Sequence, residues 1–131
     1  MTTTETGTER DAITAVVQLY IDGSSEGDAS KLEQAFHPDA RMYGSVGGQR
    51  MDIPITELYK LVEGNPMNSG GNYEATVTSI DQVEDAAIAR LDESGCWGSV
   101  SFVDFFSLAK IDGKWQIVNK TFAHTGGEMP S

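Results

Sequence analysis

The sequence predicts a single α+β domain in which N-terminal helices pack on one face of a strongly curved, mainly antiparallel sheet. Three observations predict this class. Apolar residues recur at helical spacing in the first half of the chain, and long β-rich runs fill the second half. Asp112-Gly113 separates the last two runs, and this dipeptide is a strong short-range hairpin signal. Helices gathered on one side of an antiparallel sheet form an α+β domain.

Composition limits the classes of partner. The 131 residues are 39% hydrophobic and 22% charged, which suits one domain with a real core. The formal net charge of -11 argues against nucleic acid and anionic membranes, because both reward clustered Lys and Arg. No run approaches the roughly 18 apolar residues of a membrane span, and no signal peptide opens the chain. With Cys96 as the single cysteine, we expect a cytoplasmic protein.

The first half of the chain predicts three helices. Residues 1–8 are polar and aperiodic, which predicts a disordered tail before a single domain at residues 9–127. Apolar residues at helical spacing predict a first helix from Glu9 to about Ile21, ended by Gly23 and Ser24. Asp28 is a good N-cap for a second helix that Pro38 stops. The predicted second and third helices cover Ala29–Phe36 and Pro54–Val62.

The sequence also predicts five strands. The first is closed by Gly47-Gly48, and the loop at Glu63–Gly71 is rich in turn-forming residues. Four longer strands then form a meander. The five predicted strands are Arg41–Val46, Tyr73–Ile80, Ala86–Leu91, Val100–Ile111 and Trp115–Ala123.

The final hairpin predicts which side chains share a face. A two-residue turn at Asp112-Gly113 places Ile111 opposite Lys114, and alternation then assigns every later residue to one face. The expected inward face is bulky and apolar but includes an acid and an amide, as the wall of a pocket would. Its members are Asp104, Phe106, Leu108, Ile117 and Asn119, while the expected outer face carries Val103, Phe105, Val118, Lys120 and Phe122.

Three segments carry a family resemblance: LYIDGSSEGDASKLEQAFHPDA, RMDIP and FVDFFSLAKIDGKWQIVNKTFAHTGG, at residues 19–40, 50–54 and 102–127. Through them the chain resembles the nuclear-transport-factor-2-like (NTF2-like) superfamily, which includes ketosteroid isomerase, scytalone dehydratase and SnoaL-type cyclases. Within it, the chain is most similar to small bacterial proteins described as lumazine-binding or SnoaL-like. The resemblance implies a cone-shaped α+β barrel with a small-molecule pocket.

Asp104 is the first candidate for catalysis. A carboxylate among Phe102, Phe106 and Leu108 loses hydration, which raises its pKa and suits general acid or base chemistry. The alternative is a structural carboxylate bonded to Thr121, a tyrosine or a backbone amide. Replacement by asparagine separates the two, because a desolvated catalytic acid is dispensable for stability and a bonded structural one is not.

The other candidates are the two histidines and several aromatic residues. His37, Tyr43 and His124 could polarise a substrate oxygen at the cavity mouth, although such histidines could equally cap loop backbone. Tyr20, Trp97, Phe106 and Asn119 are candidate ligand-binding residues, with ordinary core roles as the alternative for the aromatic ones. No tight ligand spacing predicts a metal, and Cys96 lacks a nucleophile motif.

Two hypotheses of function remain open. The first is a cofactor-independent isomerase, dehydratase or cyclase that moves protons on a small, apolar, oxygenated substrate. The second is a non-catalytic module that binds a ligand or builds a dimer. In both cases we expect a small-molecule ligand and a homodimer formed through the apolar outer face of the sheet.

Overall fold

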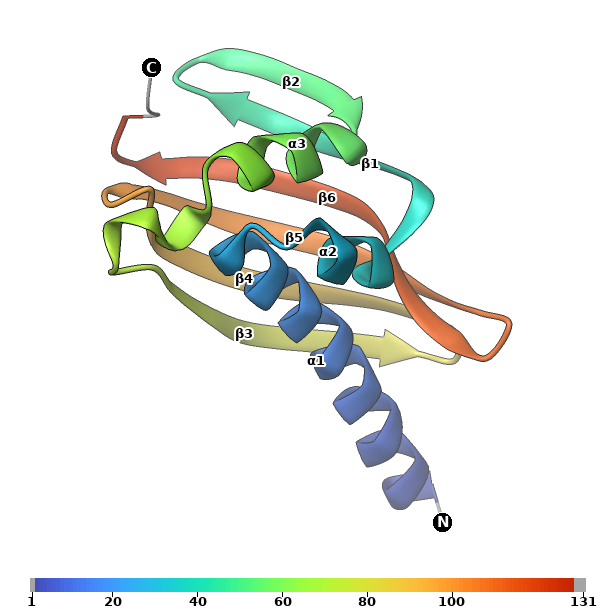
Figure 1. Cartoon of the computed structure of the whole chain (residues 1–131). Coiled ribbons are helices and arrows are strands. Elements are labelled where there is room, and N and C mark those ends of the chain that lie inside the picture. Colours follow the sequence, from blue (N-terminus) through green and yellow to red (C-terminus); the bar gives the residue numbers. More distant parts are fainter. Residues whose placement is uncertain (1, 129–131) are drawn as a thin grey trace.

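The computed structural model describes residues 2–128 and consists of three α-helices, one short 3-10 helix and a six-stranded sheet (Figure 1). The helices all lie on one face of the sheet, and the other face has no helix over it. In chain order the elements are α1 (Thr2–Glu26), α2 (Ala29–Ala35), β1 (Phe36–Val46), β2 (Gln49–Pro54), α3 (Thr56–Gly64), η1 (Met67–Gly70), β3 (Glu74–Val83), β4 (Ala86–Cys96), β5 (Val100–Ile111) and β6 (Lys114–Gly126).

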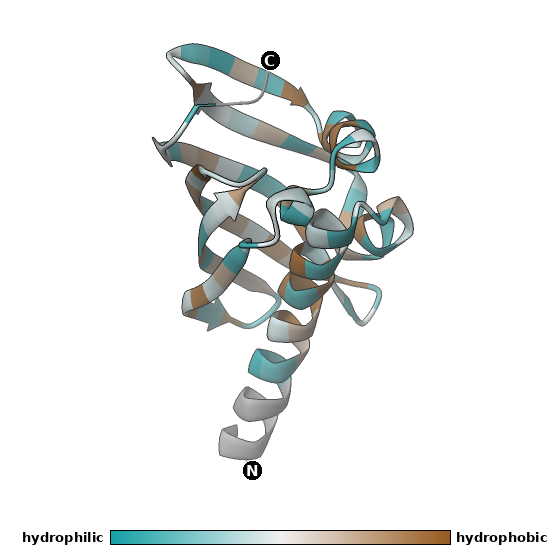
Figure 2. Cartoon of the chain, turned by 60° about the vertical axis from the view of Figure 1, so that its left-hand side comes forward, coloured by the Kyte–Doolittle hydropathy of each residue, from teal (hydrophilic) through white to brown (hydrophobic). Residues whose placement is uncertain are grey.

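The sheet has the order β2-β1-β6-β5-β4-β3. Strands β1 and β6 are parallel, and every other neighbouring pair is antiparallel. The α+β class with a curved, mainly antiparallel sheet is therefore confirmed. Because β2 and β3 are the two edges, the sheet is not closed into a full barrel. Hydrophobic and hydrophilic residues alternate along the strands, as expected for a sheet covered on one face (Figure 2).

Helix α1 is longer than the sequence predicted at both ends. It begins at Thr2, within the predicted tail, and Met1 lies outside the described residues. Extending a helix that is already anchored costs little, because only the first turn is expensive to form. Gly23 does not end the helix. A Cβ there would lie 2.9 Å from Cγ of Leu32, so this glycine lets α2 pack closely, and Gly27 at φ +73° ends α1 instead.

The segment between residues 36 and 54 contains two strands rather than one. Phe36, predicted as the end of the second helix, begins β1. The Gly47-Gly48 turn joins β1 to β2, a strand that was not predicted from the sequence, and Pro54 ends β2 instead of beginning the third helix. The burial pattern of β2 lacks a fully buried residue, which is why hydrophobic periodicity did not reveal it.

The register of the last hairpin is as predicted near the turn and wrong beyond it. Ile111 pairs with Lys114 and Leu108 with Ile117, but a bulge at Val118 shifts every later pair by one residue. Phe106 therefore faces Lys120 instead of Asn119, and Asp104 faces Phe122 instead of Thr121. One inserted residue reverses the faces of all residues after it. Lys120 and Phe122 are consequently buried, with 4% and 6% exposure, and Asn119 lies on the outer face opposite Ser107.

The segment at residues 65–72, which includes η1, packs on the turn between β4 and β5. The backbone N–H of Trp97 donates to the carbonyl of Met67 over 2.7 Å, and its indole N–H donates to the carbonyl of Asn65 over 2.6 Å. The side-chain amide of Asn72 donates to the carbonyl of Gly98 over 2.9 Å. These bonds close one end of the space between the helices and the sheet.

None of the helices in the described part of the chain is long and apolar enough to cross a membrane.

Candidate functional site

Four buried polar side chains meet between α1 and the sheet. Tyr20 comes from α1, Glu93 from β4, Asp104 from β5 and Lys120 from β6. Their exposed fractions are 0%, 3%, 0% and 4%, in that order. We call these four residues the buried polar cluster. Charged groups are almost never so deeply buried unless they are paired, so this cluster is the outstanding chemical feature of the interior.

Strand pairing brings the charged members together. Asp104 lies opposite Leu91, so Glu93 is its diagonal neighbour on the same face of the sheet. On the other side Asp104 lies opposite Phe122, so Lys120 is again a diagonal neighbour. Three strands thus direct one charged side chain each toward the underside of α1.

Tyr20 covers this group from the helix. Its ring packs edge-on against Phe106 with a centroid separation of 4.9 Å. Its hydroxyl lies 3.3 Å from Oδ2 of Asp104 and 3.4 Å from Oε1 of Glu93, so its single proton can be donated to either carboxyl group. Tyr73, which follows η1, donates to Oε2 of Glu93 over 2.6 Å.

Lys120 supplies the positive charge of the cluster. Its Nζ lies 3.7 Å from Oδ1 of Asp104, which makes an ion pair longer than a hydrogen bond. The same Nζ lies 4.2 Å from the ring centroid of Phe122 and 5.9 Å from that of Tyr20. The lysine is therefore held by one carboxylate and two aromatic rings.

Burial favours the neutral forms of the remaining groups. Desolvation, followed by the nearby Asp104 charge, raises the pKa of Glu93 well above its ordinary value. Desolvation likewise raises the pKa of Tyr20 and of Tyr73, so both phenols stay protonated and act as donors. The cluster accordingly combines one ion pair with neutral acids, which is the combination needed for proton transfer.

Two buried polar atoms in this region have no hydrogen-bond partner among the described residues: Oδ1 of Asp104 and Oγ of Ser24. Ser24 is fully buried and lies one helical turn after Tyr20, on the same side of α1. Buried polar atoms are nearly always bonded, so these two atoms are exceptions among the described residues.

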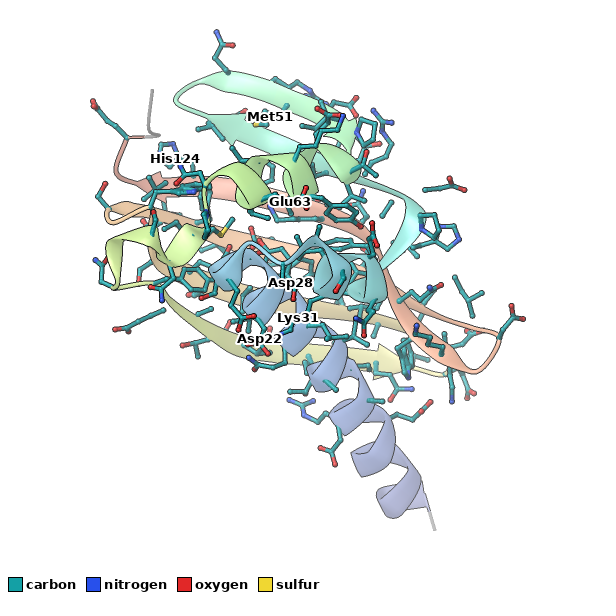
Figure 3. All side chains as sticks on the ribbon, in the orientation of Figure 1. Asp22, Asp28, Lys31, Met51, Glu63 and His124 are labelled. Carbon is teal, nitrogen blue, oxygen red and sulfur yellow. The ribbon has the colours of Figure 1, made fainter. Side chains whose placement is uncertain are left out.

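An open depression of about 450 Å³ lies at the end of the sheet, beside the turn between β1 and β2. Its lining includes Gly44, Gly47, Phe122 and His124. Figure 3 shows His124 at this end of the molecule. Phe122 lines this depression, and its ring centroid also lies 4.2 Å from Nζ of Lys120.

Residues 8–123 match the protein family described as "Putative lumazine-binding". The chain belongs to this family. It is also 31% identical over 117 residues to Aldolase FrzH of Cladobotryum sp, with 89% of this chain and 92% of that protein covered.

Solved structures confirm the NTF2-like superfamily. The chain is 35% identical to an NTF2-like protein of Methylobacillus flagellatus KT, with a TM-score of 0.81 and coverage of 89% and 92% of the two chains. It is 31% identical to an NTF2-like protein of Shewanella baltica OS155, with a TM-score of 0.80 and coverage of 95% and 96%. The resemblance inferred from the three sequence segments is therefore confirmed.

Three of the predicted site residues of this NTF2-like chain lie together. Asp104 and Tyr20 belong to the buried polar cluster, and Phe106 packs directly against the Tyr20 ring. Asp104 thus combines both interpretations raised from the sequence, because it is deeply buried among apolar residues and also bonded to a tyrosine.

The two histidines are engaged with backbone. Nδ1 of His124 accepts from the N–H of Gly47 over 3.1 Å, and Nε2 lies 2.6 Å from the carbonyl oxygen of Gly127. This arrangement places the proton on Nε2 and links the β1–β2 turn to the end of β6. Nδ1 of His37 accepts from the N–H of Asp39 over 3.0 Å, within its own strand.

The structure places the remaining candidates away from the cluster. Tyr43 pairs with Thr121 and Asp52 on the outer face, and Asn119 accepts a hydrogen bond there from Thr121 over 2.8 Å. Trp97 uses its indole N–H to hold Asn65, and its ring contacts Phe102 edge-on at 6.4 Å.

Sequence reasoning missed Glu93, Lys120 and Tyr73. Glu93 continues the inward alternation of Ala89 and Leu91, so extending the predicted strand by two residues would have found it. Lys120 was assigned to the outer face because the bulge before it has no clear sequence signal. Tyr73 was expected to begin a strand, and only its proximity to Glu93 marks it as part of the site.

Burial raises the pKa of the Cys96 thiol, which suits an inert interior cysteine.

Among the described residues, no three His, Cys, Asp or Glu side chains are grouped so that they could hold a metal ion.

Proposed function

We propose that this protein is a cofactor-independent acid–base enzyme that removes a proton from the carbon next to a carbonyl group in a small, largely apolar substrate. The observation that carries the proposal is the buried polar cluster, in which Oδ1 of Asp104 has no hydrogen-bond donor among the described residues. Asp104 is the base. A neutral Glu93 donates a hydrogen bond to the carbonyl oxygen as that oxygen gains negative charge. The Tyr20 hydroxyl, which contacts both carboxyl groups without substrate, turns its proton to the same oxygen when substrate binds.

The chemistry follows from the charges of the cluster. When the C–H bond breaks, its proton passes to Asp104 and its electron pair moves onto the carbonyl oxygen, which gives an enol or enolate. Donors that are held in place and shielded from water stabilise this oxygen more strongly than water does. The relative named aldolase supports this reaction type, because aldol addition begins with the same proton abstraction. Isomerisation and dehydration of carbonyl compounds begin in the same way.

Substrate reaches the cluster through the depression beside Phe122. This route is supported by Phe122, which lines the depression and also contacts Nζ of Lys120 with its ring. The volume of about 450 Å³ lies within the range of small-molecule sites, which are commonly about 300–1,000 Å³. Three of the residues that line the depression, at positions 44, 47 and 48, are glycines and add no side chain to it.

We expect the wild-type protein to accelerate hydrogen–deuterium exchange next to the carbonyl of small ketones in D₂O, measured by NMR on cyclohexanone, acetophenone and hydroxyacetone. Asp104→Asn should lower the exchange rate by about 10²–10⁴-fold, the usual effect of losing a general base. Asp92→Asn is the matched control, because Asp92 is a carboxylate on the outer face that pairs with Arg90 over 2.9 Å.

Asp92→Asn should exchange as fast as the wild type. If Asp104→Asn folds poorly, Tyr20→Phe tests the same chemistry by removing one donor, with an expected loss of about 10²–10³-fold. Exchange that stays at the buffer rate with all three ketones, or that is equally fast in Asp104→Asn, would contradict the proposal.

The assembly is a homodimer built through the outer face of the sheet. Phe105 and Ile88 are 41% and 46% exposed on this face, which has no helix over it (Figure 1). Beside them, Arg90 and Asp92 carry both charge signs, so a second copy related by a two-fold axis can present complementary groups. Phe122, which the sequence analysis placed in this patch, belongs to the inner face.

Light scattering at micromolar concentration should give twice the chain mass of 14.1 kDa. Phe105→Glu should give the monomer mass, because a charge at the centre of the apolar contact is buried without a partner. Val83→Glu is the matched control, since Val83 is 71% exposed at the end of β3. A monomeric wild type, or a Phe105→Glu variant that remains dimeric, would refute this interface.

A further inference from the structure

We propose that Lys120 is a covalent nucleophile that forms an imine with the carbonyl group of the substrate. This inference rests on the proposed function, because it requires a carbonyl substrate at the buried polar cluster. It adds a chemical class to that function: the substrate is an aldehyde or ketone, and the carbon acid that loses its proton is the iminium rather than the free carbonyl compound.

The surroundings of Lys120 support a nucleophilic role. The side chain is 5% exposed, and its Nζ lies beyond hydrogen-bonding distance of the carboxylate with which it forms an ion pair. Its nearest anionic atom is Oδ1 of Asp104 at 3.7 Å, and the aromatic ring of Phe122 covers it at 4.2 Å. Apolar surroundings are one of the means by which proteins make a lysine amine reactive toward carbonyl compounds.

Lys120 is also the member of the cluster nearest to a route of entry. Phe122, which contacts Nζ, lines the depression at the end of the sheet. The proposal requires the Phe122 ring to move aside so that a carbonyl carbon can reach the amine. Gly44 pairs with Phe122 on the neighbouring strand β1. A Cβ there would lie 2.8 Å from Cδ2 of Phe122, so the lack of a side chain at Gly44 makes room for the ring.

Asp104 can carry out every proton transfer that imine formation requires. The ammonium first gives a proton to Oδ1 of Asp104, and the amine nitrogen then adds to the carbonyl carbon as the C=O π bond breaks. Asp104 returns the proton to the resulting oxygen, which forms a carbinolamine, and takes a second proton from the nitrogen. It then protonates the hydroxyl, which leaves as water while the nitrogen lone pair forms the C=N bond.

The net reaction converts an ammonium and a carbonyl into an iminium and water, and Asp104 ends as the carboxylate. The nitrogen carries a positive charge before and after the reaction, so the ion pair with Asp104 is restored once the iminium has formed. The iminium also draws electrons from the neighbouring C–H bond. The same carboxylate can then take that proton and leave an enamine, which is the nucleophile of an aldol addition.

The test is reductive trapping with cyclohexanone and sodium cyanoborohydride at pH 7, followed by peptide mapping by mass spectrometry. A ketone is used because exposed lysines form imines with ketones only sparingly. We expect a cyclohexyl adduct on Lys120 in the wild type and its loss in Lys120→Arg, which retains a positive charge for Asp104. Lys60→Arg is the matched control, since the side chain of Lys60 is 73% exposed, and it should retain the Lys120 adduct.

Adducts on exposed lysines such as Lys60, with none on Lys120, would overturn the inference. The wild-type map gives this result even if Lys120→Arg fails to fold. Lack of the Lys120 adduct together with Asp104-dependent exchange would remove the imine and leave the proposed acid–base function standing. Lack of both would remove the two proposals together.

Discussion

Replacing Asp104 with asparagine is expected to lower the free energy of unfolding by about 3–5 kcal/mol at pH 7, the usual cost of removing one partner of a buried ion pair. The physical reason is the buried ammonium of Lys120. This residue is 4% exposed and forms an ion pair with Asp104. Asparagine fits the space but leaves the ammonium without a counter-charge in a low-dielectric site. Urea or thermal unfolding followed by circular dichroism measures the loss.

The double variant Asp104→Asn with Lys120→Met should recover most of this stability, because it removes both charges and keeps apolar volume. Lys110→Met is the matched control. The side chain of Lys110 is 34% exposed and pairs with Glu9 over 3.0 Å, so its loss should cost at most about 1 kcal/mol. If Asp104→Asn were as stable as the wild type, Asp104 would not be the partner of Lys120 in solution.

This result differs from the expectation drawn from the sequence alone. There, a catalytic acid in an apolar pocket could be replaced without loss, and a loss of stability indicated a purely structural carboxylate. The buried lysine removes that distinction, because Asp104 can be catalytic and still be needed to neutralise Lys120. Only the exchange and trapping measurements then report on its chemistry.

Replacing Glu93 with glutamine is expected to stabilise the protein increasingly as the pH rises above about 5. Burial and the Asp104 charge raise the pKa of Glu93 in the folded state, whereas a glutamate in the unfolded chain has a pKa near about 4.3. Between these two values the folded state holds a proton that the unfolded state has released. The stability of the wild type therefore falls with rising pH, by at most about 1.4 kcal/mol per pH unit for this group.

Glutamine imitates the neutral acid, since it keeps an acceptor oxygen for a tyrosine and adds a donor N–H, but it carries no titrating proton. The difference in unfolding free energy between Glu93→Gln and wild type should therefore grow in favour of the variant as the pH rises from 5 toward the raised pKa of Glu93. Chemical denaturation at several pH values between 5 and 8 measures it.

Asp92→Asn serves as the control for this series. Its carboxylate is half-exposed, and a hydrogen bond from Arg90 lowers the pKa of Asp92. A lowered pKa adds stability above the unfolded pKa that is lost on acidification, so Asp92→Asn should show no gain as the pH rises. A Glu93→Gln variant whose difference from wild type does not change with pH would contradict a neutral Glu93.

Much of the fold could be predicted from local sequence signals. Ile13, Val17 and Tyr20 recur at helical spacing within α1, and all three side chains are fully buried. The Asp112-Gly113 turn is where it was predicted, because a short turn requires backbone conformations that few residue pairs adopt easily. Helix ends were predicted less well, since Gly23 looks like a stop signal and is in fact a close contact with Leu32.

By itself the sequence determined the class of fold, the family, the hairpin turn and the burial of Asp104, because each depends on residue types close together in the chain. The tertiary structure alone decided what surrounds Asp104. Glu93, Lys120 and Tyr20 come from three other elements, and their meeting depends on sheet order and on how α1 crosses the sheet. The bulge at Val118 turned Lys120 inward, because one extra residue exchanges the two faces of a strand. The residues around Val118 carry no local sequence signal for this bulge, so it could not be predicted.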